Sequence, residues 1–277
     1  MQIIDGKKVE FVLSYSHGKD SGACLGAIKH LNWPLDRIVT ADIWATDTIR
    51  AEYPEQAAFK AKADQIIENR YGIKVEHYHA THVDGIDKDK VTYCDIFYKT
   101  LQSGKHVETI KGFPMQRGPW CQKLKLNAAD QIDTDADVVV TYLGIAADEP
   151  IRIARHIDKP NVLLPLVELG WEEDLCGLWS KYSDLLGPTY TCGTRDGCWF
   201  CHNQPIEQLR RLRHMYPDLW RLLLEWDKDS PVPFHSDGHT VKDFDKRFRL
   251  EDEGVLKKGD KRFRWKQLDQ PIQLSLF

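Results

Sequence analysis

Small and polar residues cluster between two apolar patterns near the start of the chain. The apolar run at residues 11–13 predicts a short buried strand, and the spacing of the apolar residues from Cys24 to Leu31 predicts a helix after it. In a strand–loop–helix turn the backbone N–H groups converge, and the helix dipole adds positive potential at the same place. The intervening loop supplies hydroxyl groups, an acid and a cation, through Ser14, Ser16, His17, Gly18, Lys19, Asp20 and Ser21. These residues predict a phosphate-binding loop.

Two common phosphate loops do not fit this stretch. The Walker loop needs a glycine five positions before Gly18, where the chain has Leu13. The glycine pattern of dinucleotide-binding turns is not present there either. An ordinary strand–helix turn, in which Asp20 and Ser21 cap the helix, is the alternative to an anion site.

Three cysteines lie close together later in the chain, in the spacing Cys192-x5-Cys198-x2-Cys201. Two residues between a pair of cysteines allow both sulfur atoms to face one ion or cluster, and three thiols need a fourth ligand. Cys121 is the best distant candidate, because it starts a predicted helix beside two lysines that favour a thiolate. These four cysteines predict a zinc or [4Fe–4S] site, and free core thiols are the alternative.

Other residues with metal-binding chemistry have simpler interpretations. His77, His79 and His82 lie close together around the end of a predicted strand, and we expect solvated side chains there, with a metal site as the alternative. Cys94 and Cys176 fall on the apolar sides of predicted helices, so we expect both to be packed thiols.

Strand and helix patterns alternate around these residues. Strands are predicted at 37–43, 73–78, 137–144 and 161–166, and helices at 53–70, 91–101, from 119 onward, 171–186 and 205–225. This alternation predicts an α/β fold with a doubly wound, mainly parallel sheet. Ligands of such sheets bind at the carboxyl ends of the strands, where the phosphate-binding loop and residues 42–48 are expected.

Composition limits the class of protein. We expect an α/β domain over residues 1–190, then a Cys-rich segment and helical extension over 191–277, in which residues 227–277 show little periodicity. The net charge of −4 gives no whole-chain signal for nucleic-acid binding. No apolar run approaches the roughly 18 residues that span a membrane, and the N-terminal residues lack a signal-peptide core. We therefore expect a cytoplasmic protein, and clustered cysteines that bind metal rather than form disulfides.

The order of several short motifs resembles the phosphoadenosine phosphosulfate (PAPS) reductase family of the PP-loop (N-type) ATP pyrophosphatase superfamily. The loop from Ser16 to Ser21 resembles the PP-loop, S-G-G-x-D-S, with His17 where glycine is usual. Over residues 9–225 the other similar motifs are Asp47-Thr48 with Tyr53-Pro54-Glu55, Trp120 to Lys125, Gly144 to Arg152 with Pro150 where serine is usual, and Pro165-Leu166 followed by Trp171.

Within this family the chain resembles the ATP pyrophosphatase components of DNA phosphorothioation systems. It has both Lys19 and Asp20 of the loop, and it lacks the Glu-Cys-Gly tail of the reductases after Cys201. The resemblance implies an adenine nucleotide alpha hydrolase-like fold, cleavage of ATP to AMP and pyrophosphate, and a [4Fe–4S] cluster. Zinc remains the alternative at the cysteines.

The resemblance also implies roles for individual residues. Lys19 and Arg152, with Lys123 or Lys125, would stabilise the phosphates, and Asp20 would hold Mg²⁺ or else cap the helix. Asp47 and Thr48 would meet the ribose or adenine, and Gly144 belongs to the binding site. Implied partners are an adenine nucleotide, a sulfur donor such as a cysteine desulfurase, a nucleic acid acceptor and a second copy of the chain, with no membrane. A sulfonucleotide reductase and a non-catalytic, zinc-stabilised nucleotide-binding subunit are the alternatives.

Overall fold

The computed structural model describes residues 1–103, 105, 107–114, 120–191, 197–235, 237–260 and 263–269. These residues form two compact units, and each is described by itself. The first combines Met1–Ile96 with Cys121–Cys198, and the second combines Phe97–Trp120 with Trp199–Phe277. The sequence placed the whole stretch 1–190 in one domain, whereas the structure assigns Phe97–Trp120 to the second unit.

A parallel sheet forms the centre of the first unit. Its strand order is β10-β9-β2-β3-β4, and every pair along this path is parallel. The strands are β2 (Lys7–Ser14), β3 (Arg37–Ala41), β4 (Val75–Tyr78), β9 (Val138–Leu143) and β10 (Val162–Leu163). Both faces of β2 are buried from Val9 to Leu13, as expected for a strand covered on both sides. The predicted α/β class and mainly parallel sheet are confirmed.

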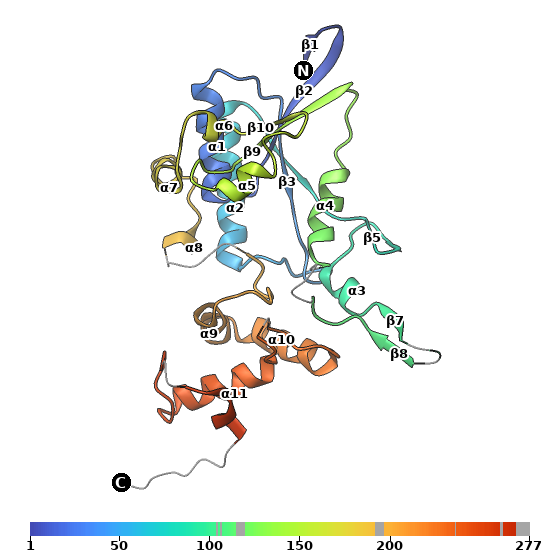
Figure 1. Cartoon of the computed structure of the whole chain (residues 1–277), viewed down its shortest axis with the longest axis vertical. Coiled ribbons are helices and arrows are strands. Elements are labelled where there is room, and N and C mark those ends of the chain that lie inside the picture. Colours follow the sequence, from blue (N-terminus) through green and yellow to red (C-terminus); the bar gives the residue numbers. More distant parts are fainter. Residues whose placement is uncertain are drawn as a thin grey trace. The chain divides into compact units, whose positions relative to one another are not determined.

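Helices cover both faces of this sheet (Figure 1). The longer ones are α1 (Lys19–His30), α2 (Pro54–Tyr71), α4 (Gln122–Asp130) and α7 (Glu173–Tyr182). Figure 1 shows α1 and α2 on one side of the strands and α4 on the other. The shorter ones are α5 (Pro150–Ala154), α6 (Pro165–Glu168) and α8 (Pro188–Thr191). Strand β1 (Gln2–Ile4) pairs antiparallel with β2, and β5 (His82–Val83) and β6 (Ile86–Asp87) form a small hairpin.

The strand order places the phosphate-binding loop at the point where the chain changes direction across the sheet. From β2 the chain moves through α1 to β3 and through α2 to β4, and it then returns to β9 on the other side of β2. Loops that leave neighbouring strands in opposite directions open a crevice at the carboxyl end of the sheet. The loop from Ser14 to Lys19 leaves β2 at this position.

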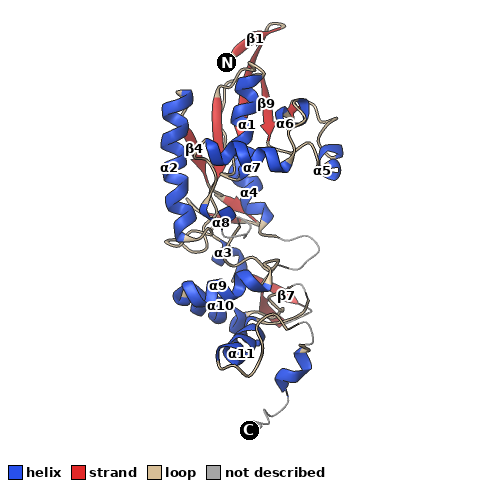
Figure 2. Cartoon of the chain, turned by 90° about the vertical axis from the view of Figure 1, so that its left-hand side faces the viewer, coloured by secondary structure: helices blue, strands red, loops and turns tan. Residues whose placement is uncertain are grey.

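The second unit is mostly helical, as Figure 2 shows by colour. It contains α9 (Ile206–Met215), α10 (Pro217–Asp229), α11 (Val241–Asp252), the 3-10 helix η1 (Trp265–Asp269) and the hairpin β7 (Thr100–Ser103) with β8 (Val107–Ile110). Aromatic rings fill its centre, where Trp226 stacks on Trp199 at 5.4 Å between ring centroids and Phe113 lies edge-on to Phe97 and Phe234. Burial of these rings supplies the main stabilisation of a unit with little sheet.

Three local predictions differ from the structure. The helix predicted over 205–225 is two helices, because Tyr216 has a φ of −133° and Pro217 starts α10. The helix predicted over 91–101 is only α3 (Tyr93–Phe97), followed by β7. Regular structure continues beyond residue 227 in α11, where Thr240 and Asp243 form a capping box.

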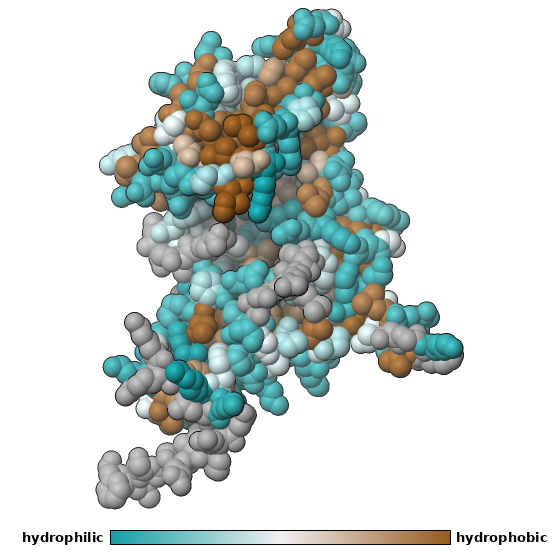
Figure 3. All heavy atoms as spheres, viewed as in Figure 1, coloured by the Kyte–Doolittle hydropathy of each residue, from teal (hydrophilic) through white to brown (hydrophobic). Residues whose placement is uncertain are grey.

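None of the helices in the described ranges is long and apolar enough to cross a bilayer. On the face that Figure 3 shows, hydrophilic residues are interspersed with apolar patches.

Candidate functional site

The phosphate-binding loop connects β2 to α1 and is held by its own serines. Ser21 Oγ donates a hydrogen bond to the Gly18 carbonyl oxygen at 3.0 Å and lies 3.1 Å from Ser16 Oγ. The backbone N–H of Ser16 donates to Ser21 Oγ at 3.2 Å. Gly18 is the N-cap residue of α1, and no side chain caps this end. The capping role considered for Asp20 and Ser21 is therefore wrong, and the first N–H of α1, on Lys19, donates to the Tyr190 hydroxyl at 3.4 Å.

His17 has an unusual backbone conformation in this loop. Its φ is +60°, in the left-handed region that glycine adopts without strain. The PP-loop that the sequence resembles has glycine at this position, so the conformation accounts for that preference. The His17 ring is fully buried, and its Nε2 lies 2.7 Å from Asp64 Oδ1 on α2. Burial lowers the His17 pKa, although the hydrogen bond to Asp64 opposes this effect.

Gly144 allows the end of β9 to approach the same loop. A Cβ atom on Gly144 would lie 2.8 Å from the Asp20 carbonyl oxygen and from the backbone N and Cα of Ser21. Side chains do not fit at such distances, so this position needs glycine. Gly144, which the resemblance assigned to the binding site, thus contributes close backbone packing against the start of α1.

Lys19 and Asp20 pair with each other. Lys19 Nζ lies 2.8 Å from Asp20 Oδ1 and 2.9 Å from Glu173 Oε1 on α7. Burial opposes the charged form of Lys19, but the hydrogen bonds to both acids outweigh it and raise the lysine pKa. Burial also raises the pKa of Asp20, against the effect of Lys19.

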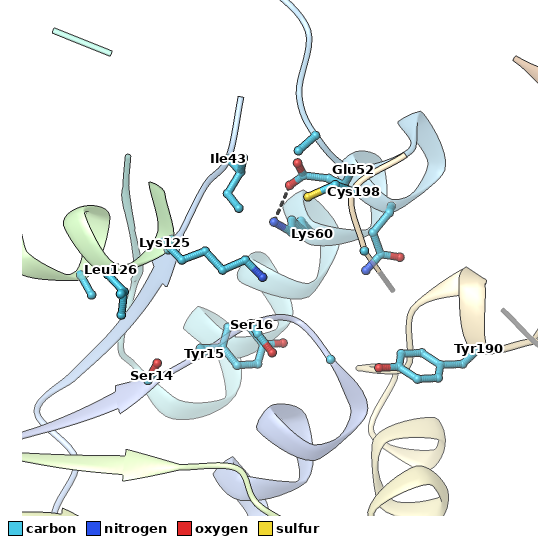
Figure 4. A pocket seen from close by; sticks show the side chains of 16 residues that line it. Ser14, Tyr15, Ser16, Ile43, Glu52, Lys60, Lys125, Leu126, Tyr190 and Cys198 are labelled. Carbon is cyan, nitrogen blue, oxygen red and sulfur yellow. Dashed lines mark hydrogen bonds and ion pairs between the residues drawn. The ribbon is translucent and has the colours of Figure 1, made fainter. Parts of the chain in front are cut away.

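A pocket of about 480 Å³ opens beside the loop, within the size range of small-molecule sites. Figure 4 shows Lys60 from α2 and Lys125 from α4 reaching into it, with Tyr190 beside the loop. The lining residues come from the loop, the end of β3, both helices and the segment before Cys198. They are Ser14, Tyr15, Ser16, Gly18, Ala41, Ile43, Ala51, Glu52, Gln56, Lys60, Lys125, Leu126, Ala129, Tyr190, Gly197 and Cys198.

The two lysines of the pocket differ in their partners. Lys60 Nζ forms ion pairs with Glu52 and with Asp42, the latter at 3.5 Å. For Lys125 the structure records no acidic partner in the described ranges. The neighbouring Lys123 points elsewhere and pairs with Asp84. Lys125 is therefore a cation of the pocket that can take up an anionic ligand without first breaking an ion pair.

Other residues assigned by the resemblance do not line this pocket. Asp47 is mostly exposed and pairs with Lys88 at 3.2 Å. The backbone N–H of Thr48 donates to Thr46 Oγ1 at 3.4 Å. Arg152 is half exposed and lies 2.7 Å from Glu149. Lys60, Glu52 and Tyr190 were not assigned from the sequence, because no local motif marks them.

Three of the four predicted cysteine ligands lie among the described residues. Cys192 lies outside the described residues, and Cys201 belongs to the second unit, so the four-thiol ligand set stays a prediction. Cys198, at the end of the first unit, lines the pocket. The prediction that Cys176 is packed is confirmed, since the side chain is buried and burial raises its pKa to about 12.

Two histidines and two aspartates form a series of alternating contacts that begins at His17 in the loop. His77 on β4 lies between Asp42, 3.0 Å from Nδ1, and Asp64, 3.1 Å from Nε2, and Asp64 also contacts His17. The hydrogen bonds to both acids raise the His77 pKa to about 9. Burial would raise the pKa of Asp64, but its hydrogen bonds to the two histidines hold that pKa below its usual value. The charged form of Asp42 is stabilised by Lys60 and Arg50 as well as by His77.

Of the three neighbouring histidines, His82 is exposed, as expected, whereas His77 is partly buried in a cluster with residues distant in the sequence. His79 Nε2 contacts the Asp89 carbonyl oxygen at 2.8 Å, and His82 pairs with Asp87 in the exposed hairpin. His77 instead belongs with His17 and Asp64, which lie 60 and 13 positions away in the sequence. The sign of this cluster in the sequence was the histidine at residue 17, where the PP-loop has glycine. Asp64 stands in no motif that would have pointed to it.

Comparisons of the chain with protein families, curated proteins and solved structures give no match.

Proposed function

We propose that the pocket binds ATP and cleaves it between the α and β phosphates, giving AMP and pyrophosphate. The observation that carries this proposal is the combination of an uncapped helix start, a serine-rich loop and a lysine-lined pocket at the turning point of a parallel sheet. N–H groups at a helix start and nearby cations are the groups that bind phosphate. The order of PP-loop motifs along the sequence favours adenylation over transfer of the terminal phosphate.

The reaction we propose transfers the adenylyl group. A nucleophilic oxygen, of the acceptor or of water when no acceptor is present, attacks the α phosphorus. The bond from that phosphorus to the bridging oxygen breaks, pyrophosphate leaves with the bonding electrons, and the proton of the nucleophile goes to solvent. Attack by water gives AMP directly, whereas the adenylylated acceptor releases AMP when sulfur displaces it. Negative charge grows on the leaving group, so donors already aimed at it lower the barrier. The hydroxyl groups of Ser14 and Ser16 and the ammonium group of Lys125 supply such donors in the pocket, and Lys19, which does not line it, would join them on leaving Glu173.

Lys19 must change partners to act in this way. Its ammonium group is held by Asp20 and by the largely exposed Glu173, so the pair with Glu173 costs little to break. Bound phosphate offers more negative charge than one carboxylate. We propose that Lys19 moves from Glu173 to the phosphates when the nucleotide binds.

The apolar wall of the pocket suits the adenine ring. Ile43 at the end of β3 and Leu126 and Ala129 on α4 line it opposite the loop. Apolar side chains bury a base, and a few polar groups fix its orientation. We therefore propose that these residues, rather than Asp47 and Thr48, contact the adenosine part of the ligand.

The residues near the loop also suit the implied magnesium ion. The carboxylate of Asp20 does not cap α1, and Glu149 and Glu173 lie near enough to affect its pKa. Carboxylates of this kind would hold Mg²⁺, which neutralises phosphate charge when bound. A [4Fe–4S] cluster or zinc at Cys121, Cys192, Cys198 and Cys201 remains part of the proposal, and the activated acceptor would receive sulfur from a donor protein.

The proposal predicts that Lys19→Ala abolishes release of AMP and pyrophosphate while the protein stays folded. Glu173→Gln should keep the activity, because it removes only the partner that Lys19 leaves. Lys29→Ala, at the other end of α1, is the matched control and should behave like the wild type. Wild-type turnover by Lys19→Ala would show that the lysine has no catalytic role.

One observation favours a second candidate. Cys198 places a thiol in the pocket, and a sulfonucleotide reductase needs a thiol that attacks its substrate. Tighter binding of PAPS than of ATP, together with loss of sulfite release in Cys198→Ser, would support that activity.

A further inference from the structure

The cluster below the loop has the composition of a metal site. His17, Asp64 and His77 each offer one ligand atom, and these atoms all lie within 4.8 Å of one another. The Nε2 atom of His17 contacts Asp64 Oδ1, and the Nε2 atom of His77 contacts Asp64 Oδ2. Two imidazoles and one carboxylate are a ligand set for zinc and other divalent transition metals, with positions left open for water or another ligand. We propose that His17, Asp64 and His77 bind a divalent transition metal ion, a site separate from the predicted cysteine site and independent of the proposed ATP chemistry.

The distances are close to those that a metal ion requires. Asp64 lies 2.7 Å from His17 Nε2 and 3.1 Å from His77 Nε2. Ligands that are each about 2.1 Å from a tetrahedral zinc ion lie about 3.4 Å from one another. A small outward movement of the side chains would therefore admit the ion, which would displace the protons now shared with Asp64.

The surroundings of His77 match those of a metal-bound histidine. A ligating imidazole usually donates its second N–H to a carboxylate, which fixes the ring and its tautomer. His77 Nδ1 lies 3.0 Å from Asp42, and Arg50 holds this acid at 3.0 Å. Asp42 is almost fully buried, so the support is rigid.

The burial and the backbone conformation of His17 are unfavourable, and its hydrogen bond to Asp64 alone does not explain them. The ring is fully buried, the backbone is in the left-handed region, and Nδ1 is recorded as having no hydrogen-bond partner within the described residues. Glycine would avoid all three costs at this position. A metal ion bound at Nε2 gives a reason for the burial of the ring and for its backbone conformation.

One side of the site is accessible to solvent, and the other side includes His17 of the phosphate-binding loop. The exposed fractions of the side chains rise from 0% for His17 to 21% for Asp64 and 33% for His77, so an ion can enter from the side of β4. His17 lies between Ser16 and Gly18, which line the pocket. A metal ion would thus fasten the phosphate-binding loop to α2 and β4.

Cobalt spectroscopy separates this site from the cysteines, because thiolate ligands give strong charge-transfer bands that nitrogen and oxygen ligands do not. We expect the metal-free full-length protein to bind one equivalent of Co²⁺ through a site without thiolate bands, and Zn²⁺ to displace it. Binding should also raise the unfolding temperature, since the ion binds only the folded chain.

Variants test the assignment to these residues. His77→Ala, Asp64→Asn and His17→Gly should each lower the affinity of the thiolate-free site at least tenfold, as removal of a ligand would. His82→Ala removes an exposed histidine that also pairs with an acid, and it should bind Co²⁺ as the wild type does. Asp64→Asn keeps the size of the side chain and serves if another variant fails to fold. Cobalt bound only through thiolates, or wild-type binding by the folded variants, would overturn the proposal.

Discussion

At the residue scale, the phosphate-binding loop combines serines that line the pocket with a lysine held by two acids. The types and spacing from Ser14 to Ser21 predicted a phosphate-binding loop, and the structure places these residues at the end of β2 beside a pocket. The contacts of Lys19 with Glu173 were not predictable, since 154 positions separate the two residues and no local pattern links them. Asp64 likewise has no local signal, although it contacts both His17 and His77.

At the residue scale, Lys125 provides the sharpest prediction about binding. Lys125→Ala should weaken ATP binding about tenfold, because it removes a charge-assisted hydrogen bond to phosphate. Lys123→Ala is the matched control on the same helix, since Lys123 pairs with Asp84 away from the pocket. Calorimetric titration with ATP would measure both. Equal affinities for the two variants would remove Lys125 from the site.

Elements of the first unit were predictable from apolar runs, because parallel strands covered on both sides need them. The four predicted later strands all occur, although β10 has only two residues. The break between α9 and α10 could have been found from Pro217, and the start of α11 from Thr240 and Asp243. The membership of Phe97–Trp120 in the second unit depends on contacts between distant segments, which periodicity does not encode.

At the element scale, the contact between β9 and α1 predicts the effect of Gly144→Ala. The new Cβ would overlap backbone atoms of Asp20 and Ser21, so we expect a loss of about 1–3 kcal/mol in the free energy of unfolding. ATP affinity should fall as well, because the loop must shift. For stability alone, Gly197→Ala is the control, since no described atom outside its chain neighbours lies within 4 Å of its Cβ position. Urea unfolding measures both, and equal stabilities would contradict the close approach.

The ion pairs between α9 and α11 predict a pH dependence of stability. Glu251 on α11 contacts Arg210 at 2.5 Å and Arg247 at 3.0 Å, and its side chain is 5% exposed. Burial alone would raise its pKa, but the two arginines lower it below the ordinary value of 4.5. Its contribution is therefore complete above about pH 4.5 and is lost as the pH falls through the lowered pKa.

Glu251→Gln should cost about 2 kcal/mol near pH 7, with a smaller difference from the wild type near pH 3. Glu207→Gln is the control, because Glu207 contacts the same Arg210 from an exposed position. It should change stability by less than about 0.5 kcal/mol. A difference between Glu251→Gln and the wild type that does not shrink in acid would argue against the lowered pKa.

At the scale of the whole molecule, the first unit contains the loop, the pocket and the histidine cluster. The second unit is built from two separate segments around an aromatic core. Of the predicted cysteine ligands that the structure describes, Cys121 and Cys198 belong to the first unit and Cys201 to the second.

The most direct measurement is phosphorus NMR of the full-length protein, purified without oxygen and incubated with ATP and Mg²⁺. Cleavage between the α and β phosphates predicts resonances of AMP and pyrophosphate growing in equal amounts, and their absence in Lys19→Ala. ADP and inorganic phosphate would contradict cleavage between the α and β phosphates, because they would show that the terminal phosphate is transferred instead.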